Sequence, residues 1–224
     1  MARVLAVSCT HAPAMHKDFP KFMEKIWKQY RCNKLIHLGD LCNNASASFH
    51  PLNPSMPGPA DEYKATKKQL KLITNRFPQA TMIQGNHDAL GPRKAEAMGI
   101  LPEWLRDFHD LWGLPKGWEV HPRYSEIVVD NVRYMHGDSG RAGQFGAVKT
   151  AMSKFQSVVM GHLHSESGVW YYANSGQRIF GCNVGCGIDY HQMAFLYGQK
   201  FIKKPIVSLA VILDGFPIVI PLEL

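Results

Sequence analysis

Short apolar runs recur along the first part of the chain, separated by longer amphipathic segments. Arg3–Val7, Lys34–Leu38 and Ala80–Ile83 are short and largely apolar, which is typical of buried strands. Between them, apolar residues recur at helical spacing over Asp18–Tyr30 and Asp61–Phe77, so each of these segments is predicted to form an amphipathic helix. This alternation of strand and helix is the pattern of an α/β protein.

The second half of the chain favours hairpins. Tyr124–Val129 and Val132–Met135 flank Asp130-Asn131, a favoured turn pair, and predict two antiparallel strands. Gly143–Phe155 predicts a helix and Ser157–Met160 a further buried strand. The remaining predicted strand pairs turn at Asn174–Gly176 and, between Ile206–Leu213 and Pro217–Leu222, at Asp214-Gly215.

Two segments lack such periodicity. Ser46–Pro59 is rich in Ser, Asn and Pro and is predicted to be a long loop. Gly91–Trp118 is expected to be irregular, with short helices around Pro102–Leu111. No internal repeat or linker divides the chain, so we expect one domain over residues 1–224. The order of elements predicts a mixed α/β sandwich with helices on its outer faces.

Composition and charge restrict the class of protein. No apolar run approaches the ~20 residues that span a bilayer. The N-terminal residues lack an apolar leader and a cleavage site, so we expect a cytoplasmic protein that does not bind membranes. The net charge of +7 favours polyanionic partners such as nucleic acid. The densest basic cluster, Lys64–Lys71, is better explained as the solvated face of a helix.

The five cysteines do not predict a disulfide framework, because their number is odd and their spacing has no repeat. Cys182 and Cys186 form a C-x3-C pair without a second close pair. We therefore interpret them as small buried residues near a strand end.

Side chains that can bind metal ions follow five of the predicted strands. Each would be unremarkable alone, since a lone histidine or a Gly-Asp pair after a strand is usually structural. Five of them at strand ends are a strong joint signal, because ligands bind where the strands of an α/β sheet end. The clusters are Cys9 with His11, then Asp40, then Asn86 with His87 and Asp88, then His136, and then His162 with His164.

These side chains divide into two candidate metal sites that share Asp40. Imidazole suits Zn, Fe, Mn and Ni, and carboxylate and amide oxygens suit harder ions. Two ions ~3.5–4 Å apart would clamp a phosphoryl group and lower the pKa of a bridging water. The first ion would take Cys9 or a water, His11, Asp40 and His164. The second would take Asp40, Asn86, His136 and His162.

His87 is left without a metal. It is next to the ligand Asn86, and we expect it to point at the leaving oxygen as the general acid, with Asp88 holding its orientation. In this interpretation His87 and Asp88 are the catalytic residues.

The five motifs together resemble those of the calcineurin-like metallophosphoesterases. They read S-C-T-H, G-D-L-C-N, G-N-H-D, H-G-D and G-H-L-H and span residues 8 to 164. The resemblance implies a four-layer αββα sandwich with two mixed β-sheets and a dinuclear site for phosphoester hydrolysis. It implies two divalent or trivalent ions, with manganese expected and zinc, iron or nickel as alternatives. No obligate protein partner is implied.

Three residues depart from the family pattern. Cys9 stands where the family has an aspartate ligand, Asn43 where many members have an aspartate beside the site, and Leu163 where threonine is common. As a thiolate, Cys9 would favour zinc or iron at its position. As a neutral buried thiol it would leave the first site weak. It could also be a substitution introduced by experimenters.

The substrate class is less constrained. Arg93 follows G-N-H-D and Arg141 follows H-G-D, so both are candidates to bind substrate phosphate, and either could be an ordinary surface arginine. The aromatic residues between the third and fourth motifs favour the core of a helical insertion over a nucleobase platform. They are Trp104, Phe108, Trp112, Trp118 and Tyr124.

Three functions therefore compete. A metal-dependent phosphoesterase acting on monoesters or diesters, with nucleotides or nucleic acid as candidate substrates, is favoured because His87 accompanies a full ligand set. A non-catalytic scaffold with an impaired first metal site is the alternative, since some relatives are thought to have lost catalysis. A nucleic-acid-binding module with a structural metal is disfavoured, because the donor set is too large for one closed site.

Overall fold

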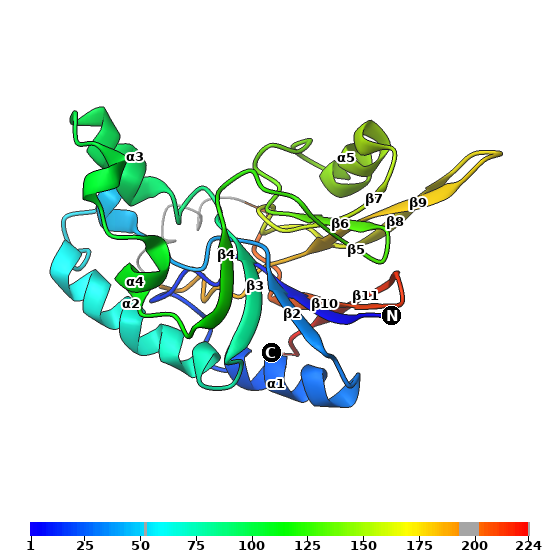
Figure 1. The fold of residues 1–224 in the computed structure, drawn as a ribbon, viewed down its shortest axis with the longest axis horizontal. Coiled ribbons are helices and arrows are strands. Elements are labelled where there is room, and N and C mark those ends of the chain that lie inside the picture. Colours follow the sequence, from blue (N-terminus) through cyan, green and yellow to red (C-terminus); the bar gives the residue numbers. More distant parts are fainter. Residues whose placement is uncertain (52, 193–201, 224) are drawn as a thin grey trace.

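The computed structural model describes residues 1–51, 53–192 and 202–223, so residue 52 of the predicted Ser46–Pro59 loop lies outside the described residues. Two β-sheets face each other at the centre of the molecule (Figure 1). The first sheet has the order β11-β10-β1-β2-β3-β4. Its strands are β1 (Arg3–Val7), β2 (Lys34–His37), β3 (Gln79–Ile83), β4 (Gly117–His121), β10 (Ser208–Leu213) and β11 (Phe216–Pro221).

The second sheet has the order β5-β6-β7-β9-β8 and is also mixed. Neighbouring strands β6, β7 and β9 are parallel, and β5 and β8 join them as antiparallel edge strands. Its strands are β5 (Ile127–Val129), β6 (Val132–Met135), β7 (Ser157–Met160), β8 (Ser167–Ala173) and β9 (Arg178–Val184).

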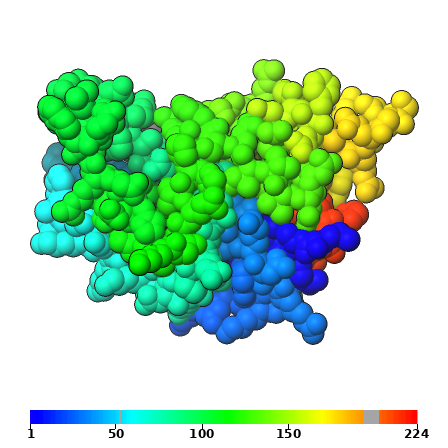
Figure 2. All heavy atoms as spheres, in the orientation of Figure 1, coloured from blue at the N-terminus to red at the C-terminus, as the bar shows by residue number. Residues whose placement is uncertain are grey.

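Helices cover the outer faces of both sheets, which gives four layers (Figure 1). Helices α1 and α2 pack on the first sheet and α5 on the second. Helix α3 projects from one end of the body and the β8–β9 hairpin from the other (Figure 2). The helices are α1 (Phe19–Gln29), α2 (Pro59–Thr74), α3 (Leu90–Ala97), α4 (Phe108–Trp112) and α5 (Gly146–Lys154), with 3-10 turns η1 (Ala45–Ala47) and η2 (Pro102–Trp104).

The alternation of side chains along β1 shows how the layers form. Leu5 and Val7 belong to the core between the first sheet and its helices, whereas Val4 and Ala6 belong to the core between the two sheets. Successive residues of a strand point to opposite faces, so an uninterrupted apolar run can fill two cores at once. The four-layer sandwich with two mixed sheets is confirmed.

The structure corrects the sequence prediction in the segment expected to be irregular. Leu90–Ala97 forms helix α3, none of whose residues is buried, so it has no apolar face to reveal it. Gly117–His121 forms strand β4, which pairs in parallel with β3. This five-residue strand lies between two prolines, Pro115 and Pro122, and its alternation is too short to stand out.

The expectation that the aromatic residues of this segment form the core of a helical insertion is only partly correct. Trp112 and Trp118 are buried in the core beneath the first sheet, with Trp118 on strand β4, whereas Trp104 and Tyr124 are exposed. Cys182 lies within β9 and Cys186 just after it, both fully buried and unpaired. In the described residues, no helix is both long and apolar enough to cross a membrane.

Strand direction decides where the ends of the strands meet. β1, β2, β3 and β4 run parallel to one another in the first sheet, and β6, β7 and β9 do so in the second. The segments that follow these strands therefore gather at one edge of the sandwich. The candidate metal ligands all lie in those segments.

Candidate metal centre

Two groups of ligand atoms converge between the ends of the two sheets. In each group the ligand atoms lie within 4.8 Å of one another. β1 and β2 supply ligands from the first sheet, and β6 and β7 supply them from the second. The first group is Cys9, His11, Asp40 and His164, and the second is Asp40, His136 and His162.

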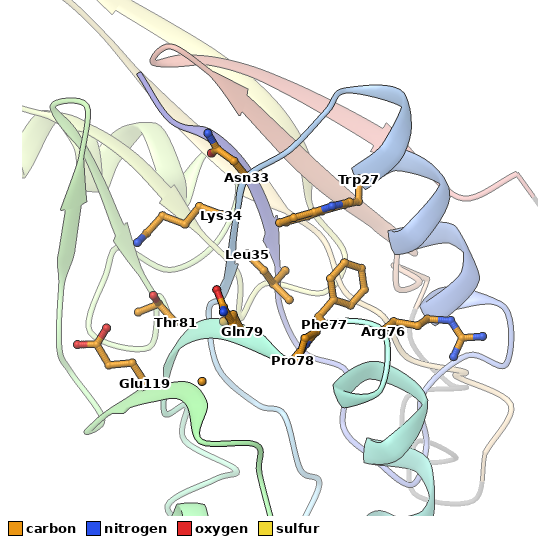
Figure 3. Close-up of a pocket in the computed structure, with 12 residues that line it drawn as sticks. Trp27, Asn33, Lys34, Leu35, Arg76, Phe77, Pro78, Gln79, Thr81 and Glu119 are labelled. Atoms are coloured by element: carbon orange, nitrogen blue, oxygen red, sulfur yellow. The ribbon is translucent and has the colours of Figure 1, made fainter.

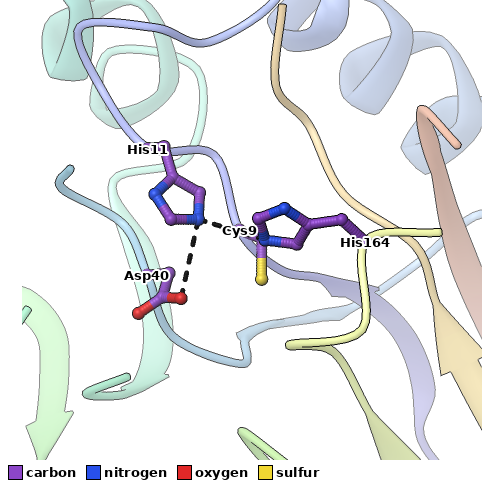
Figure 4. Close-up of side chains that lie close together, drawn as sticks. All are labelled: Cys9, His11, Asp40 and His164. Carbon is purple, nitrogen blue, oxygen red and sulfur yellow. Dashed lines mark hydrogen bonds and ion pairs between the residues drawn. The ribbon is translucent and has the colours of Figure 1, made fainter. Parts of the chain in front are cut away.

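His11 contacts two other members of the first group, Asp40 and His164 (Figure 4). Its Nε2 atom lies 3.2 Å from Nε2 of His164 and 3.5 Å from Oδ2 of Asp40. The Cys9 thiol belongs to the same cluster. Two imidazole nitrogens this close would repel one another if both were protonated, so the arrangement suits a cation placed between them.

The second group is built around the same Asp40 carboxylate. Its Oδ2 atom lies 3.3 Å from Nε2 of His136, and that nitrogen lies 3.0 Å from Oδ1 of Asn86. The rings of His136 and His162 lie 5.1 Å apart, centre to centre. Asp40 therefore faces both groups, as expected from the sequence.

Hydrogen bonds behind the ligands fix which ring nitrogen faces the centre. Nδ1 of His136 donates to the carbonyl of Leu38 at 2.7 Å, and Nδ1 of His11 is 3.1 Å from Oδ1 of Asn43. Each bond holds Nδ1 away from the centre, so Nε2 is the ring nitrogen that faces the position of a metal ion. Asn43, which departs from the family's aspartate, still supplies the acceptor oxygen at this position.

Two glycines make room for the ligands Asp40 and His136. A Cβ atom on Gly85 would lie 2.2 Å from Oδ1 of Asp40, and one on Gly39 would lie 2.6 Å from Nδ1 of His136. Real Cβ atoms do not approach other atoms so closely, so the ligands can take these positions only beside glycine. Gly39 also has a φ of +103°.

The backbone is strained at the ligand positions themselves. Cys9, His11, Asp40 and His162 all have φ between 47° and 64°. The left-handed region is uncommon for residues other than glycine, and such conformations gather at functional sites. Four of the seven expected ligands thus have backbones that the surrounding fold must hold in place.

Charge coupling between the ligands follows their geometry. Burial alone would raise the pKa of Asp40, but His136 and His11 hold it well below its usual range. Burial would likewise lower the pKa of His136, but Asp40 raises it to about 9. Burial lowers the pKa of His164 to about 4 and that of His11 well below its usual value. The first group is therefore a carboxylate with neutral imidazoles, which is the state that binds metal ions.

Cys9 is placed as a ligand but is held as a neutral thiol in the metal-free chain. Burial is the main reason that its pKa is raised well above the usual value, and the charge of Asp40 adds to this. The hydroxyl of Ser8 lies 3.1 Å from its Sγ atom, and the amide of His162 donates to Sγ at 3.3 Å. A bound cation would reverse the effect, since it removes the proton from a coordinating thiol. The donor set fits a metal ion.

The structure contradicts one expectation about the catalytic pair. Asp88 does not orient His87, because its carboxylate accepts hydrogen bonds from the backbone amides of Leu41, Cys42 and Gly85. The task falls to the backbone carbonyl of Asn43, which lies 2.8 Å from Nδ1 of His87. Asp88 instead ties the Asp40 loop to the G-N-H-D loop. Its buried carboxylate next to Asp40 has a pKa raised to about 7.

The two arginines expected to bind substrate make their side-chain contacts with residues outside the two ligand groups. The Arg93 guanidinium packs over the ring of Phe49 at 5.4 Å. Nε of Arg141 lies 3.4 Å from the hydroxyl of Ser153, along helix α5. Both side chains are exposed. A role for either in substrate binding remains a prediction.

A cavity of about 490 Å³ lies at the other end of the first sheet (Figure 3). It is lined by the first residues of β2, β3 and β4, together with Trp27 from α1 and Arg76 from the segment after α2. Parallel strands begin there and end at the metal ligands, so this cavity is separate from the candidate site.

The fold and the paired ligand groups define a class: an α/β sandwich with a dinuclear-type centre at the carboxyl ends of its strands. Residues 2–184 match the family model described as calcineurin-like phosphoesterase. The chain belongs to that family. A comparison with curated protein sequences found no match.

The chain is also similar to solved structures of low sequence identity. A Vps29 single mutant from Entamoeba histolytica is 11% identical, with 99% of each chain covered and a TM-score of 0.44. Vps29 from Chaetomium thermophilum is 9% identical, with 100% of this chain and 97% of that chain covered and a TM-score of 0.47. Yfce, a phosphoesterase from E. coli, is 14% identical, with 94% and 87% covered and a TM-score of 0.45.

Proposed function

We propose that this protein is a metal-dependent phosphoesterase that hydrolyses phosphomonoesters or phosphodiesters. The observation that carries the proposal is the Asp40 carboxylate, which faces two ligand groups at once while His87 lies beside them. A site for one structural ion would need neither the second group nor His87.

The residues of the chain divide the work as follows. Cys9, His11, Asp40 and His164 would hold one ion, and Asp40, Asn86, His136 and His162 the other. When bound, the ions would supply Lewis acidity toward the phosphoryl oxygens and an activated water.

His87 supplies the proton to the leaving oxygen. Nδ1–H of His87 donates a hydrogen bond to the carbonyl of Asn43, so Nε2 is the atom that carries the transferred proton. The ring of His87 lies 4.5 Å from that of His11, centre to centre, which keeps it against the first ligand group. The His87 amide also donates to Oδ1 of Asp40 at 2.8 Å, which fixes the carboxylate that both ligand groups share and the acid relative to each other.

The donor atoms bear on metal identity. A thiolate at Cys9 favours zinc or iron in the first group, and the second group offers only oxygen and nitrogen donors. Manganese is the first ion to test in the second group, with zinc, iron and nickel as alternatives. Nucleotides and nucleic-acid phosphodiesters are the first substrates to test, since the chain is basic. A cytoplasmic location remains a prediction.

The test combines metal stoichiometry with turnover. We expect two ions per chain by elemental analysis after adding manganese, zinc or iron. We also expect hydrolysis of 4-nitrophenyl phosphate or its bis-ester to fall at least a hundredfold in His87→Ala. His109→Ala, on helix α4, is the matched histidine control and should retain activity. One ion or none, with no turnover under any metal, would reject the phosphoesterase and leave the scaffold.

A further inference from the structure

Strand β4, which the sequence did not reveal, also ends at the metal-centre edge. The amide of Gln84 donates to the carbonyl of His121 at 2.9 Å, and Gln84 lies two residues before the ligand Asn86. The chain then leaves the first sheet and crosses to β5 in the second (Figure 1). The crossing begins with the turn Pro122–Ser125, closed by a 3.1 Å bond from the Ser125 amide to the Pro122 carbonyl. This turn therefore lies on the Asn86 side of the centre.

The turn is tied to a ligand loop by an ion pair. Nε of Arg123 lies 2.6 Å from Oδ2 of Asp138, which follows the ligand His136 by two residues. The Asp138 side chain is 5% exposed and that of Arg123 is 18% exposed. The guanidinium is thus one ion pair away from the second ligand group.

Most N–H groups of the Arg123 guanidinium have no hydrogen-bond partner among the described residues. Among residues 1–51, 53–192 and 202–223, its only hydrogen bond is the one from Nε to Asp138. The two outer nitrogens, with four N–H groups, are unused. Oδ1 of Asp138 is buried without a partner, so the pair is single and not a two-point fork. An arginine fixed at Nε with a free outer edge can bind two phosphate oxygens at once.

Tyr124, the next residue of the turn, has a strained backbone conformation. Tyr124 is the third residue of the turn and has a φ of +71°, a position where glycine is usual. Its side chain gains little from burial, because 58% of it is exposed. Its ring lies under the guanidinium of Arg123, 4.5 Å from ring centre to Cζ. A strained, exposed tyrosine is expected where the side chain serves a binding site.

We propose that Arg123, positioned by Asp138 and Tyr124, binds the phosphate group of the substrate on the side of the centre formed by Asn86, His136 and His162. The inference rests on the proposed function in taking a phosphoester as the ligand. It assigns to Arg123 the role that the sequence suggested for Arg93 and Arg141.

The competing explanation is that the Arg123–Asp138 ion pair only holds the crossover against the H-G-D loop. Removal of a purely structural ion pair would lower stability, but it would leave the affinity for phosphate unchanged. The chain offers a matched control, because Arg178 packs over Tyr171 at 5.5 Å on the β8–β9 hairpin. Arg178→Ala removes the same kind of arginine–tyrosine contact away from the centre.

The experiment measures two quantities on metal-loaded protein: binding of inorganic phosphate by calorimetry, and KM and kcat for 4-nitrophenyl phosphate and its bis-ester. Loss of charge-assisted bonds in Arg123→Ala should weaken phosphate binding and raise KM by about 10- to 100-fold, with a smaller effect on kcat. Arg123→Lys should restore part of the affinity, and Arg178→Ala should match the wild type.

Two further variants change the residues that position Arg123. They should alter phosphate affinity or KM, which would stay unchanged if the ion pair were only structural. Tyr124→Gly relieves the strained φ, so its melting temperature should equal or exceed that of the wild type while its phosphate affinity falls. Asp138→Asn should raise KM while the protein keeps its metal content.

The outcomes separate this inference from the proposed function. Arg123-dependent phosphate binding without any turnover would reject the phosphoesterase and support the anion site. Turnover with the same KM in Arg123→Ala and Arg178→Ala would reject the role of Arg123 and keep the enzyme. Failure of the wild type to bind phosphate would overturn the inference too.

Discussion

Replacing Gly85 by alanine tests whether the centre depends on close packing around Asp40. A Cβ atom at this position would lie 2.2 Å from Oδ1, 2.8 Å from Cγ and 2.5 Å from the backbone nitrogen of Asp40. Since one of these atoms is backbone, a rotation of the carboxylate alone cannot relieve the overlap. Asp40 must move, and it is the carboxylate that both ligand groups share.

The expected magnitude has two parts. Overpacking of this kind costs about 1–3 kcal/mol, which for a chain of this size lowers the melting temperature by about 2–12 °C without metal. Metal-linked stabilisation should be lost as well. Each site would contribute about 2.7 kcal/mol at a free metal concentration a hundred times its dissociation constant.

The assay is thermal unfolding with chelator and with added metal, read beside metal stoichiometry after dialysis. The wild type should gain stability with metal, and Gly85→Ala should gain little or nothing. Gly91→Ala is the control, because a Cβ on this helix α3 glycine would meet no atom within 4 Å. It should be neutral or stabilise by about 0.5 kcal/mol. Two ions and an unchanged melting temperature in Gly85→Ala would refute the reasoning.

Three further predictions address the ligands and the surface. Cys9→Asp should shift the first site from zinc toward manganese, measured by competition between the two ions, and an unchanged preference would argue against ligation by the thiol. Asn43→Ala removes the acceptor for Nδ1 of His11 and should weaken metal binding by about 10- to 100-fold in calorimetric titration. Partial burial raises the pKa of Glu126, but its ion pairs with Lys154 and a neighbouring arginine outweigh this effect and lower the pKa. These ion pairs should therefore add about 0.5–1 kcal/mol to the free energy of unfolding above pH ~4.5. This stabilisation is lost as the pH falls through the lowered pKa of the folded state. The melting temperatures of the wild type and Glu126→Gln should therefore converge in acid.

The sequence revealed most of the ligand arrangement because each of the five ligand clusters follows its own strand directly. Asp40 and His136 are placed by the ends of short apolar runs, and the direction of parallel strands brings those ends together. The information needed was local to each run. The only long-range assumption was that the strands are neighbours.

The sequence could not reveal contacts made between segments without a shared local pattern. Asp88 accepts amides from Leu41 and Cys42, 47 and 46 residues away, so its proximity to His87 in the chain was misleading. The pairing of Arg123 with Asp138 depends on strand β4, whose five residues were too few to show a period. Arg93 and Arg141 were suggested instead because they follow motifs in the chain.

The division of the ligands between two sheets has a consequence for how the protein matures. A chain that has reached only the G-N-H-D motif after β3 contains Cys9, His11, Asp40 and Asn86, but it lacks His136, His162 and His164. The centre depends on contacts across some 150 residues, so it forms only after both sheets have paired, and long-range pairings form slowly. During synthesis the N-terminal half would present a half-built cluster of soft and hard donors for many seconds. Tight metal binding would then be a late event that marks the completed fold.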